Sequence, residues 1–191
     1  VVIADFSDNP GSGAYGDSTF LLQGLIDAGF TNAAFGTICD SDAAAALIEA
    51  GEGADVTVTL GGKIDPAYGP PLTLTGTVER ITDGVYVALG PRWKGVTHRL
   101  GPTAVFRVGG ISIVVASNRV QLTEIEAFTH AGIDPRTLDV VAVKSMQHFR
   151  AAYQPISGAI VICDSGALSG KDISKLPYTR LRRPIFPLDL D

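Results

Sequence analysis

The sequence predicts an α/β domain with a mostly parallel sheet, crossover helices and an antiparallel β insertion at about residues 72–116. Runs rich in Val and Ile, typical of buried parallel strands, alternate with helix-length segments before and after that insertion. Within residues 72–116 the strand patterns are instead separated by short Gly-containing turns, which favour hairpins. The 191 residues are 46% hydrophobic and 18% charged, which suits one compact domain spanning residues 1–191.

The first sixty residues are predicted to form strand–helix–strand–helix–strand. Strands are expected at 1–6, 33–39 and 55–60, with helices at 18–28 and from 40 or 41 to 50. Asp17 is the expected N-cap of the first helix, because an Asx side chain can accept from first-turn amides. The side chains expected on the buried face of that helix are Phe20, Leu21, Leu25 and Ala28.

The insertion and the last third of the chain follow. Residues 72–81 and 85–89 are expected to pair around Thr82-Asp83-Gly84, with an exposed connection at 90–100. The remaining expected elements are strands at 103–108, 111–116, 140–143 and 159–163, and helices at 122–131 and 146–153. The Arg- and Pro-rich tail is predicted to be extended and to lie on another surface.

The overall charge and the scattered cysteines exclude several classes of function. A net charge of −5 and a pI of about 5.1 argue against nucleic-acid binding, which requires a basic face. No apolar run is long enough for a membrane span, and no signal peptide opens the chain. Cys39 and Cys163 stand alone in apolar contexts, so both are predicted to be reduced and buried, and the protein to be cytoplasmic.

The start of the chain predicts a longer polypeptide. Val1 already lies inside an expected strand, no initiator Met is present, and Met146 is the single methionine. We therefore expect residues 1–191 to be a fragment of a two-domain chain with an N-terminal partner domain.

Polar residues follow two of the expected strands. Lys144, Ser145, His148 and Arg150 come after the strand at 140–143, and Asp8 and Asn9 come after the first strand. Open α/β sheets bind ligands at the carboxyl ends of their strands. If the two strands share one sheet, these side chains meet at one edge and form a candidate site.

Gly11, Gly13 and Gly16 have the spacing G-x-G-x-x-G between a strand and a helix. This loop has three interpretations: a nucleotide site, a flexible turn, or a loop that lines a substrate cleft. The neighbouring carboxylates of Asp8 and Asp17 would repel a pyrophosphate, and the helix starts too late to face a phosphate bound in the loop.

The other polar residues also have alternative roles. Asp8 and Asn9 either cap a turn or orient a ligand or a metal-bound group. Arg150 suits carboxylate recognition and His148 suits proton transfer, although a surface Arg and a capping His are the simpler readings. Lys144 leaves a buried strand, which favours a functional or interfacial role. Three histidines and two cysteines are scattered, so the sequence predicts no metal site in this chain.

At these residues the chain resembles the C-terminal domain of the microcystin-degradation (microcystinase C, MlrC-like) family of zinc metallopeptidases. The matching segments span nearly the whole sequence. They are Asp8-Asn9-Pro10-Gly11 with Gly13 and Gly16-Asp17, Gly61-Gly62-Lys63, Gly132-Ile133-Asp134-Pro135, Lys144-Ser145 with His148-Phe149-Arg150, and Arg183-Pro184 with Pro187-Leu188-Asp189.

The resemblance implies a two-domain hydrolase of peptide or amide substrates, in which the N-terminal domain supplies most or all zinc ligands and the catalytic acid/base. The present domain would close the cleft and be inactive alone. The candidate catalytic residues are His148, Arg150 and Lys144, and the candidate substrate-binding residues are Asp8, Asn9, Gly11, Gly13, Asp17 and Ser145. The alternatives are a small-molecule or nucleotide binding module that uses the Gly11–Gly16 loop, and a structural or homodimerisation domain.

Overall fold

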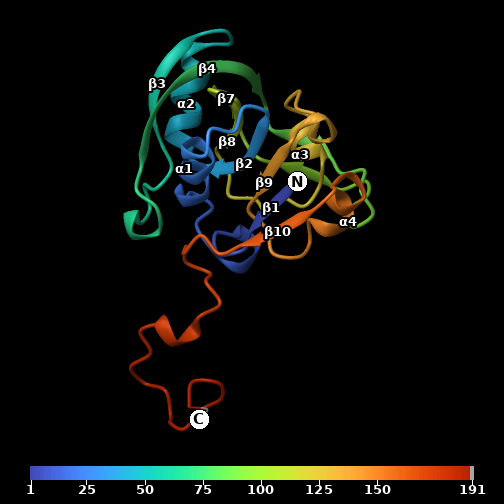
Figure 1. The fold of residues 1–191 in the computed structure, drawn as a ribbon. Coiled ribbons are helices and arrows are strands. Elements are labelled where there is room, and N and C mark those ends of the chain that lie inside the picture. Colours follow the sequence, from blue (N-terminus) through green and yellow to red (C-terminus); the bar gives the residue numbers. More distant parts are fainter. Residues whose placement is uncertain (190–191) are drawn as a thin grey trace.

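The computed structural model describes residues 1–189, apart from the side chain of Lys175. An eight-stranded sheet in the order β10-β1-β9-β2-β8-β7-β4-β3 forms its centre (Figure 1). Its strands are β1 (Val2–Asp5), β2 (Ala33–Cys39), β3 (Asp55–Leu60), β4 (Leu72–Thr82), β7 (Thr103–Val108), β8 (Ile111–Ala116), β9 (Val140–Val143) and β10 (Ile160–Cys163). A separate two-stranded sheet consists of β5 (Val85–Val87) and β6 (Thr97–Arg99).

Helices cover both faces of the sheet, which gives three layers (Figure 1). The longer helices α1 (Phe20–Asp27) and α2 (Ser41–Ala50) bury Leu22, Leu25 and Leu47 against one face. The short helices α3 (Glu126–Thr129) and α4 (Arg150–Tyr153) bury Phe128 and Tyr153 against the other. Single 3-10 turns are η1 (Pro10–Ser12), η2 (Pro66–Tyr68), η3 (Pro135–Thr137), η4 (Gln154–Ile156) and η5 (Ile173–Lys175).

The five strands β10, β1, β9, β2 and β8 are parallel, which confirms the predicted α/β class. Val2 pairs with Val141 of β9 and with Ile160 of β10. The Val, Ile and Ala content of β1 and β9 matches burial on both faces, as expected for central parallel strands, whereas the edge strand β10 exposes Val161 and Ile162. All five carboxyl ends therefore lie at one edge of the sheet.

The antiparallel half differs from the prediction in its partners. β3, expected in the parallel part, lies at the sheet edge and pairs antiparallel with β4. Its alternation explains this, because Thr57 and Thr59 face outward and contact Thr75 and Thr73 across the pair. The expected pairing of 72–81 with 85–89 is wrong. Both edges of β4 are occupied by β3 and β7, and β5 pairs with β6 instead.

The start of α1 also differs from the prediction. The helix begins at Phe20, its N-cap residue Thr19 makes no side-chain cap hydrogen bond, and Asp17 binds another loop. Phe20, expected in the core, is 39% exposed, whereas Leu22 and Leu25 are buried. The capping prediction for α2 is confirmed, since the Asp40 carboxylate accepts from the Ala43 amide at 3.0 Å.

The two cysteines are free and half-buried, whereas full burial was expected. The pKa of the Cys39 thiol is raised mainly by partial burial and to a smaller extent by the charge of Asp17. The pKa of the Cys163 thiol is raised mainly by burial and to a smaller extent by the charge of Asp5. Both groups are therefore protonated, weakly reactive thiols at neutral pH.

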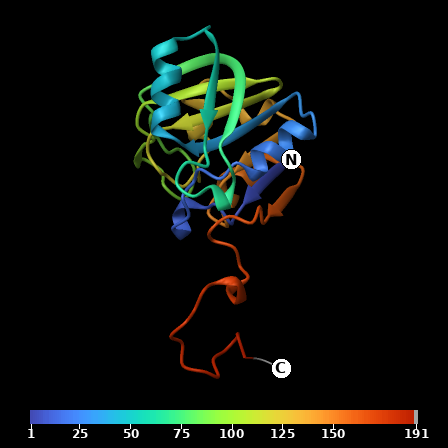
Figure 2. The ribbon, with the colours of Figure 1, turned by 90° about the vertical axis from the view of Figure 1, so that its left-hand side faces the viewer.

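After β10 the chain leaves the body of the molecule. Residues 171–189 form an extended segment that projects away from the three layers in both views (Figures 1 and 2). None of the helices within residues 1–189 is both long and apolar enough to cross a membrane.

Candidate functional site

Polar residues gather where the five parallel strands end. The first polar residues after four of these strands are Ser7, Asp40, Ser117 and Lys144, and Asp164 and Ser165 follow β10. They come from segments far apart in the sequence, and the parallel pairing brings them to the end of the sheet at which these strands terminate. We call this end of the sheet the carboxyl edge. The prediction that Asp8, Asn9 and Lys144 meet at one edge is confirmed.

Lys144 forms a buried ion pair with Asp8, and both residues are 1% exposed. Its Nζ lies 2.6 Å from Asp8 Oδ2 and donates to the carbonyls of Gly16 at 3.0 Å and Ser18 at 2.8 Å. An ammonium group has three N–H donors, so these contacts use all of them. In this structure Lys144 fastens the loop after β1 to β9 and has no donor left for a ligand.

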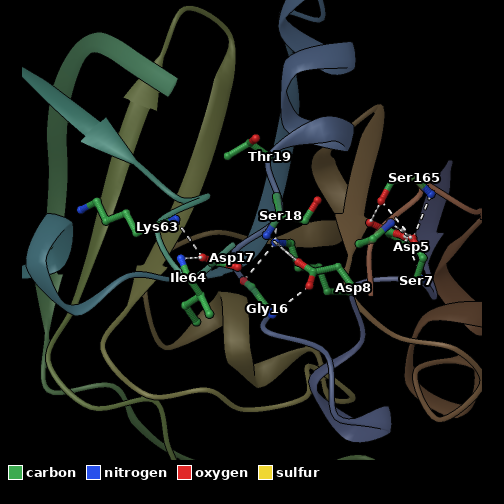
Figure 3. A network of polar contacts seen from close by, with 12 residues as sticks. Asp5, Ser7, Asp8, Gly16, Asp17, Ser18, Thr19, Lys63, Ile64 and Ser165 are labelled. Atoms are coloured by element: carbon green, nitrogen blue, oxygen red, sulfur yellow. Dashed lines mark hydrogen bonds and ion pairs between the residues drawn. The ribbon is translucent and has the colours of Figure 1, made fainter. Parts of the chain in front are cut away.

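The carboxylate of Asp8 occupies the position that an anion would take in the glycine loop. Its oxygens accept from the amides of Gly16 and Ser18, each at 2.8 Å (Figure 3). Four more loop amides donate within the loop, those of Gly11, Ser12, Gly13 and Ala14. A phosphate site requires such amides to be available, so this geometry does not favour the nucleotide interpretation.

Asp17 and Asp40 position the loop that follows β3. Asp17 accepts from the amides of Lys63 at 3.0 Å and Ile64 at 3.1 Å (Figure 3). Asp40 accepts from the Gly61 amide at 2.9 Å and from the Lys63 ammonium at 2.8 Å. Gly61 has φ of 65°, a conformation that glycine adopts readily. Both carboxylates therefore support backbone around the site.

A fourth carboxylate, that of Asp5, joins β1 to the segment after β10. Asp5 accepts from the hydroxyls of Ser7 at 2.8 Å and Ser165 at 2.7 Å (Figure 3). The hydroxyl oxygen of Ser7 in turn accepts from the amides of Ser165 at 3.0 Å and Ala167 at 3.2 Å. This network fixes where the C-terminal segment leaves the sheet.

Gln121 connects the two predicted site segments, the glycine loop and the residues after β9. Its Nε2 donates to Ser145 Oγ at 3.1 Å, and its Oε1 lies 3.3 Å from Nδ1 of His148. A Cβ atom on Gly11 would collide with the same amide and would push the end of the Gln121 side chain aside. His148 is exposed while Ser145 is buried. The glycine loop and His148 therefore lie on the same side of the sheet.

Other predicted residues stand apart from this group. Arg150 donates to Gln147 Oε1 at 2.8 Å and stacks on the ring of Phe149 at 5.5 Å. The Asn9 side chain caps η1 by accepting from the Gly11 amide, and Gly13, with φ of 94°, ends that turn. In these contacts Asn9 and Gly13 shape the loop, and Arg150 belongs to the surface of α4.

Gln121 was missed in the sequence, although the signal that selected Lys144 also applies to it. It lies shortly after the buried strand β8, in the segment between that strand and α3. Because 103–116 was treated as part of an insertion, the parallel pairing of β8 with β2 was not foreseen. That pairing places the residues after β8 at the carboxyl edge.

Cavities lie at both ends of the sheet. One of about 250 Å³ at the carboxyl edge is lined by residues including Asp17, Asp40 and Lys63. A larger one of about 300 Å³, lined by residues including Arg80 and Arg107, lies near the turn between β7 and β8. That turn is at the opposite edge, so the larger cavity is separate from the candidate site.

The fold and the site together define an open α/β domain with an ordered polar carboxyl edge. Residues 3–180 match the family described as "MlrC C-terminus". The chain belongs to this family, in agreement with the resemblance found in the sequence.

Two relatives extend this comparison. Microcystinase C from Sphingomonas sp. is 30% identical over 189 residues, which cover 99% of this chain and 36% of that protein. A crystal structure from Mesorhizobium sp. BNC1, described as a proposed metallopeptidase, has a TM-score of 0.88 at 21% identity and covers 100% of this chain. At that identity the likeness shows the fold alone. The chain spans 36% and 38% of the two relatives' lengths.

A metallopeptidase fold relative raises the question of whether this chain could hold a metal ion. Within residues 1–189, no three His, Cys, Asp or Glu side chains are grouped closely enough to do so. The carboxylates at the carboxyl edge, those of Asp5, Asp8, Asp17 and Asp40, accept hydrogen bonds from amides, hydroxyls or lysines. These residues therefore do not fit a catalytic metal centre, which needs three protein ligands with an open position.

Proposed function

We propose that this chain is the substrate-cleft part of a metal-dependent peptidase or amide hydrolase, in which an N-terminal domain of the same polypeptide binds zinc. Membership of the MlrC C-terminus family and the names of the two relatives support a peptidase-like role. One observation supports assigning zinc binding to the N-terminal domain and substrate contact to this chain, which we call the division of labour. The carboxylates at the carboxyl edge are engaged in holding loops, whereas an imidazole and an amide are presented toward the outside.

His148 is the proposed substrate-contacting group. Its Nδ1 lies against the amide oxygen of Gln121, so a proton on Nδ1 would be held there and Nε2 would be an acceptor. Ser145, which is buried, receives a hydrogen bond from the Gln121 amide and fixes its orientation. In this arrangement His148 can accept a hydrogen bond from a substrate N–H or move a proton at Nε2.

The other candidate residues have supporting roles in this proposal. Lys144 and Asp8 hold the loop that approaches Gln121, and Asp17 holds the neighbouring loop after β3. Arg150 remains a candidate for binding a substrate carboxylate, because its guanidinium makes one side-chain hydrogen bond, to Gln147, and otherwise stacks on Phe149. The proposed substrates are small peptides or amides.

The test is made in the complete polypeptide, with purified variants of matched metal content. His148→Ala is expected to lower kcat/KM by about 100-fold, the usual contribution of a positioned proton-transfer group, while the bound metal is unchanged. Gln154→Ala, which removes another exposed polar side chain from the same segment, is the matched control. Full activity of His148→Ala would refute the role of His148, and activity of residues 1–191 alone would refute the division of labour.

A further inference from the structure

Residues 171–189, which we call the C-terminal arm, project away from the body of the molecule (Figures 1 and 2) and carry exposed apolar side chains. Five large ones are between 36% and 78% exposed: Leu176, Tyr178, Leu181, Ile185 and Phe186. Single exposed apolar side chains are ordinary on protein surfaces. This many on one short projecting segment mark a contact surface.

The base of the arm is fixed at the carboxyl edge. The Ser169 amide donates to the carbonyl of Ser7 at 2.7 Å, next to the network of Asp5, Ser7 and Ser165. The ammonium of Lys171 then lies 4.4 Å from the ring centroid of Phe6. These contacts make the arm start beside the candidate site.

The tip of the arm is closed by its own polar contacts. The carboxylate of Asp189 accepts from the guanidinium of Arg183 and from the amide of Ile185, and the Asp189 amide donates back to the Ile185 carbonyl at 3.1 Å. This closed turn presents Phe186, the most exposed large apolar side chain in the described chain at 78%. A partner would therefore meet a tip that is already ordered, which lowers the entropic cost of binding.

We propose that the C-terminal arm clasps the N-terminal domain of the same polypeptide, with Phe186 inserted into an apolar recess on that domain. The inference rests on the proposed function, in which that domain faces the carboxyl edge. The relatives have room for such a domain, since this chain accounts for 36% and 38% of their lengths. An arm that starts at this edge and points away from the sheet would extend along the surface of an N-terminal domain placed there.

The charge of the arm indicates the chemistry of the recess. Residues 171–189 include five basic and two acidic residues, although the whole chain has a net charge of −5. Arg180 and Arg182 are exposed on the arm. The surface around the recess is therefore expected to be acidic, which would align the arm before the apolar contact forms.

The test compares tryptic cleavage after Arg180 and Arg182 in the complete polypeptide and in residues 1–191. Cleavage is expected to be at least about tenfold slower in the complete polypeptide, because proteolysis follows the fraction of time the arm is released. Phe186→Ala should restore fast cleavage. Leu89→Ala, which removes an equally apolar and 68% exposed side chain from the β5–β6 hairpin, should leave cleavage slow.

Each outcome separates this inference from the proposed function. Equal cleavage rates in the two chains would overturn the clasp even if the polypeptide hydrolyses amides. A protected arm in a polypeptide that binds no metal would support the clasp and contradict the proposed function. Protection that appears only with dimer formation in sedimentation would assign the arm to a second copy, and would overturn the inference.

Discussion

Lys144 and Lys63 each pair with a carboxylate at the carboxyl edge, but they differ in exposure. The Lys144 side chain is 2% exposed and its partner Asp8 is equally buried, whereas the Lys63 side chain is 34% exposed. Removing one partner of a buried pair leaves an uncompensated charge. The two lysines therefore form a matched comparison of a buried and a partly solvated ion pair.

Lys144→Met is expected to lower the free energy of unfolding by about 3–5 kcal/mol, because it leaves the buried Asp8 carboxylate without its cationic partner. Lys63→Met should cost less than Lys144→Met, because the Lys63 side chain is partly solvated and the buried Asp40 carboxylate keeps the Gly61 and Ala43 amides as donors. Urea unfolding followed by circular dichroism measures both values. An equal cost for the two variants would contradict the role of Lys144 as the fastener of the loop.

Glu124 is a buried carboxyl group near the β5–β6 hairpin, and its Oε2 has no hydrogen-bond partner among residues 1–189. Burial, and then the charge of Glu126, raises its pKa, which the Trp93 amide and Arg92 partly offset. A carboxyl pKa that is higher in the folded state favours the protonated form on folding. Glu124 therefore costs stability at pH values above its folded pKa, and that cost disappears as the pH falls toward 4.5.

Glu124→Gln is expected to raise Tm at pH 8 by about 2–4 °C, the shift that 1 kcal/mol produces in a chain of this size. The gain should shrink as the pH is lowered and vanish near pH 4, where the wild-type carboxyl is protonated. Glu49→Gln, at an exposed position of α2, serves as the control with no change. A gain that is independent of pH would contradict the assignment to Glu124 ionisation.

At the scale of elements, two glycines illustrate opposite requirements. Gly24 lies in the exposed part of α1, and a Cβ atom there would meet no atom within 4 Å. Gly62 has φ of 60°, and a Cβ atom there would collide with the backbone carbonyl of Gly69. The first glycine weakens a helix, and the second is required by the loop after β3.

Gly24→Ala is expected to raise the free energy of unfolding by about 0.5–1 kcal/mol through helix propensity. Gly62→Ala should lower it by more than about 1 kcal/mol, because the strained φ and the collision add. Thermal unfolding of the two variants gives both signs in one experiment. Stabilisation by Gly62→Ala would show that the loop conformation described here is wrong.

The elements also show what the sequence could predict. Apolar runs predicted β2 and β9 with the bounds that the structure has, because burial on both faces leaves little ambiguity. Partners were harder to predict. The alternation of β3 was visible, but its antiparallel pairing with β4 depends on which edge of the sheet is open. The pairing of Lys144 with Asp8, 136 residues apart, depends on the same topology.

Short helices were the least predictable elements. The segment at 122–131 was expected to be helical throughout, yet α3 covers only Glu126–Thr129. Leu122, Thr123 and Glu124 are buried in a non-helical path, where the Glu124 carbonyl accepts from the Tyr153 hydroxyl at 3.1 Å. Tertiary contacts of this kind override local periodicity, and they also explain why Gln121 was not selected as a site residue.

At the scale of the whole molecule, residues 1–191 alone are expected to bind no stoichiometric zinc. The carboxylates at the carboxyl edge already accept internal hydrogen bonds, and releasing them would undo three loops. Elemental analysis after dialysis against micromolar zinc provides the measurement, with the complete polypeptide as the positive control. Stoichiometric zinc in residues 1–191 that is lost on Asp40→Asn would contradict the proposed division of labour.

The strand order has a consequence for how the chain acquires its structure. Among the described strands β1 pairs with β9 and β10 alone, so Val2 has no strand partner until Val141 and Ile160 have been synthesised. During synthesis the first apolar strand therefore stays without neighbours until most of the chain has left the ribosome. Such long-range closure is slow, and it leaves early strands open to aggregation. Low expression temperature or a chaperone should therefore raise the yield of properly assembled chain more than any change at the carboxyl edge.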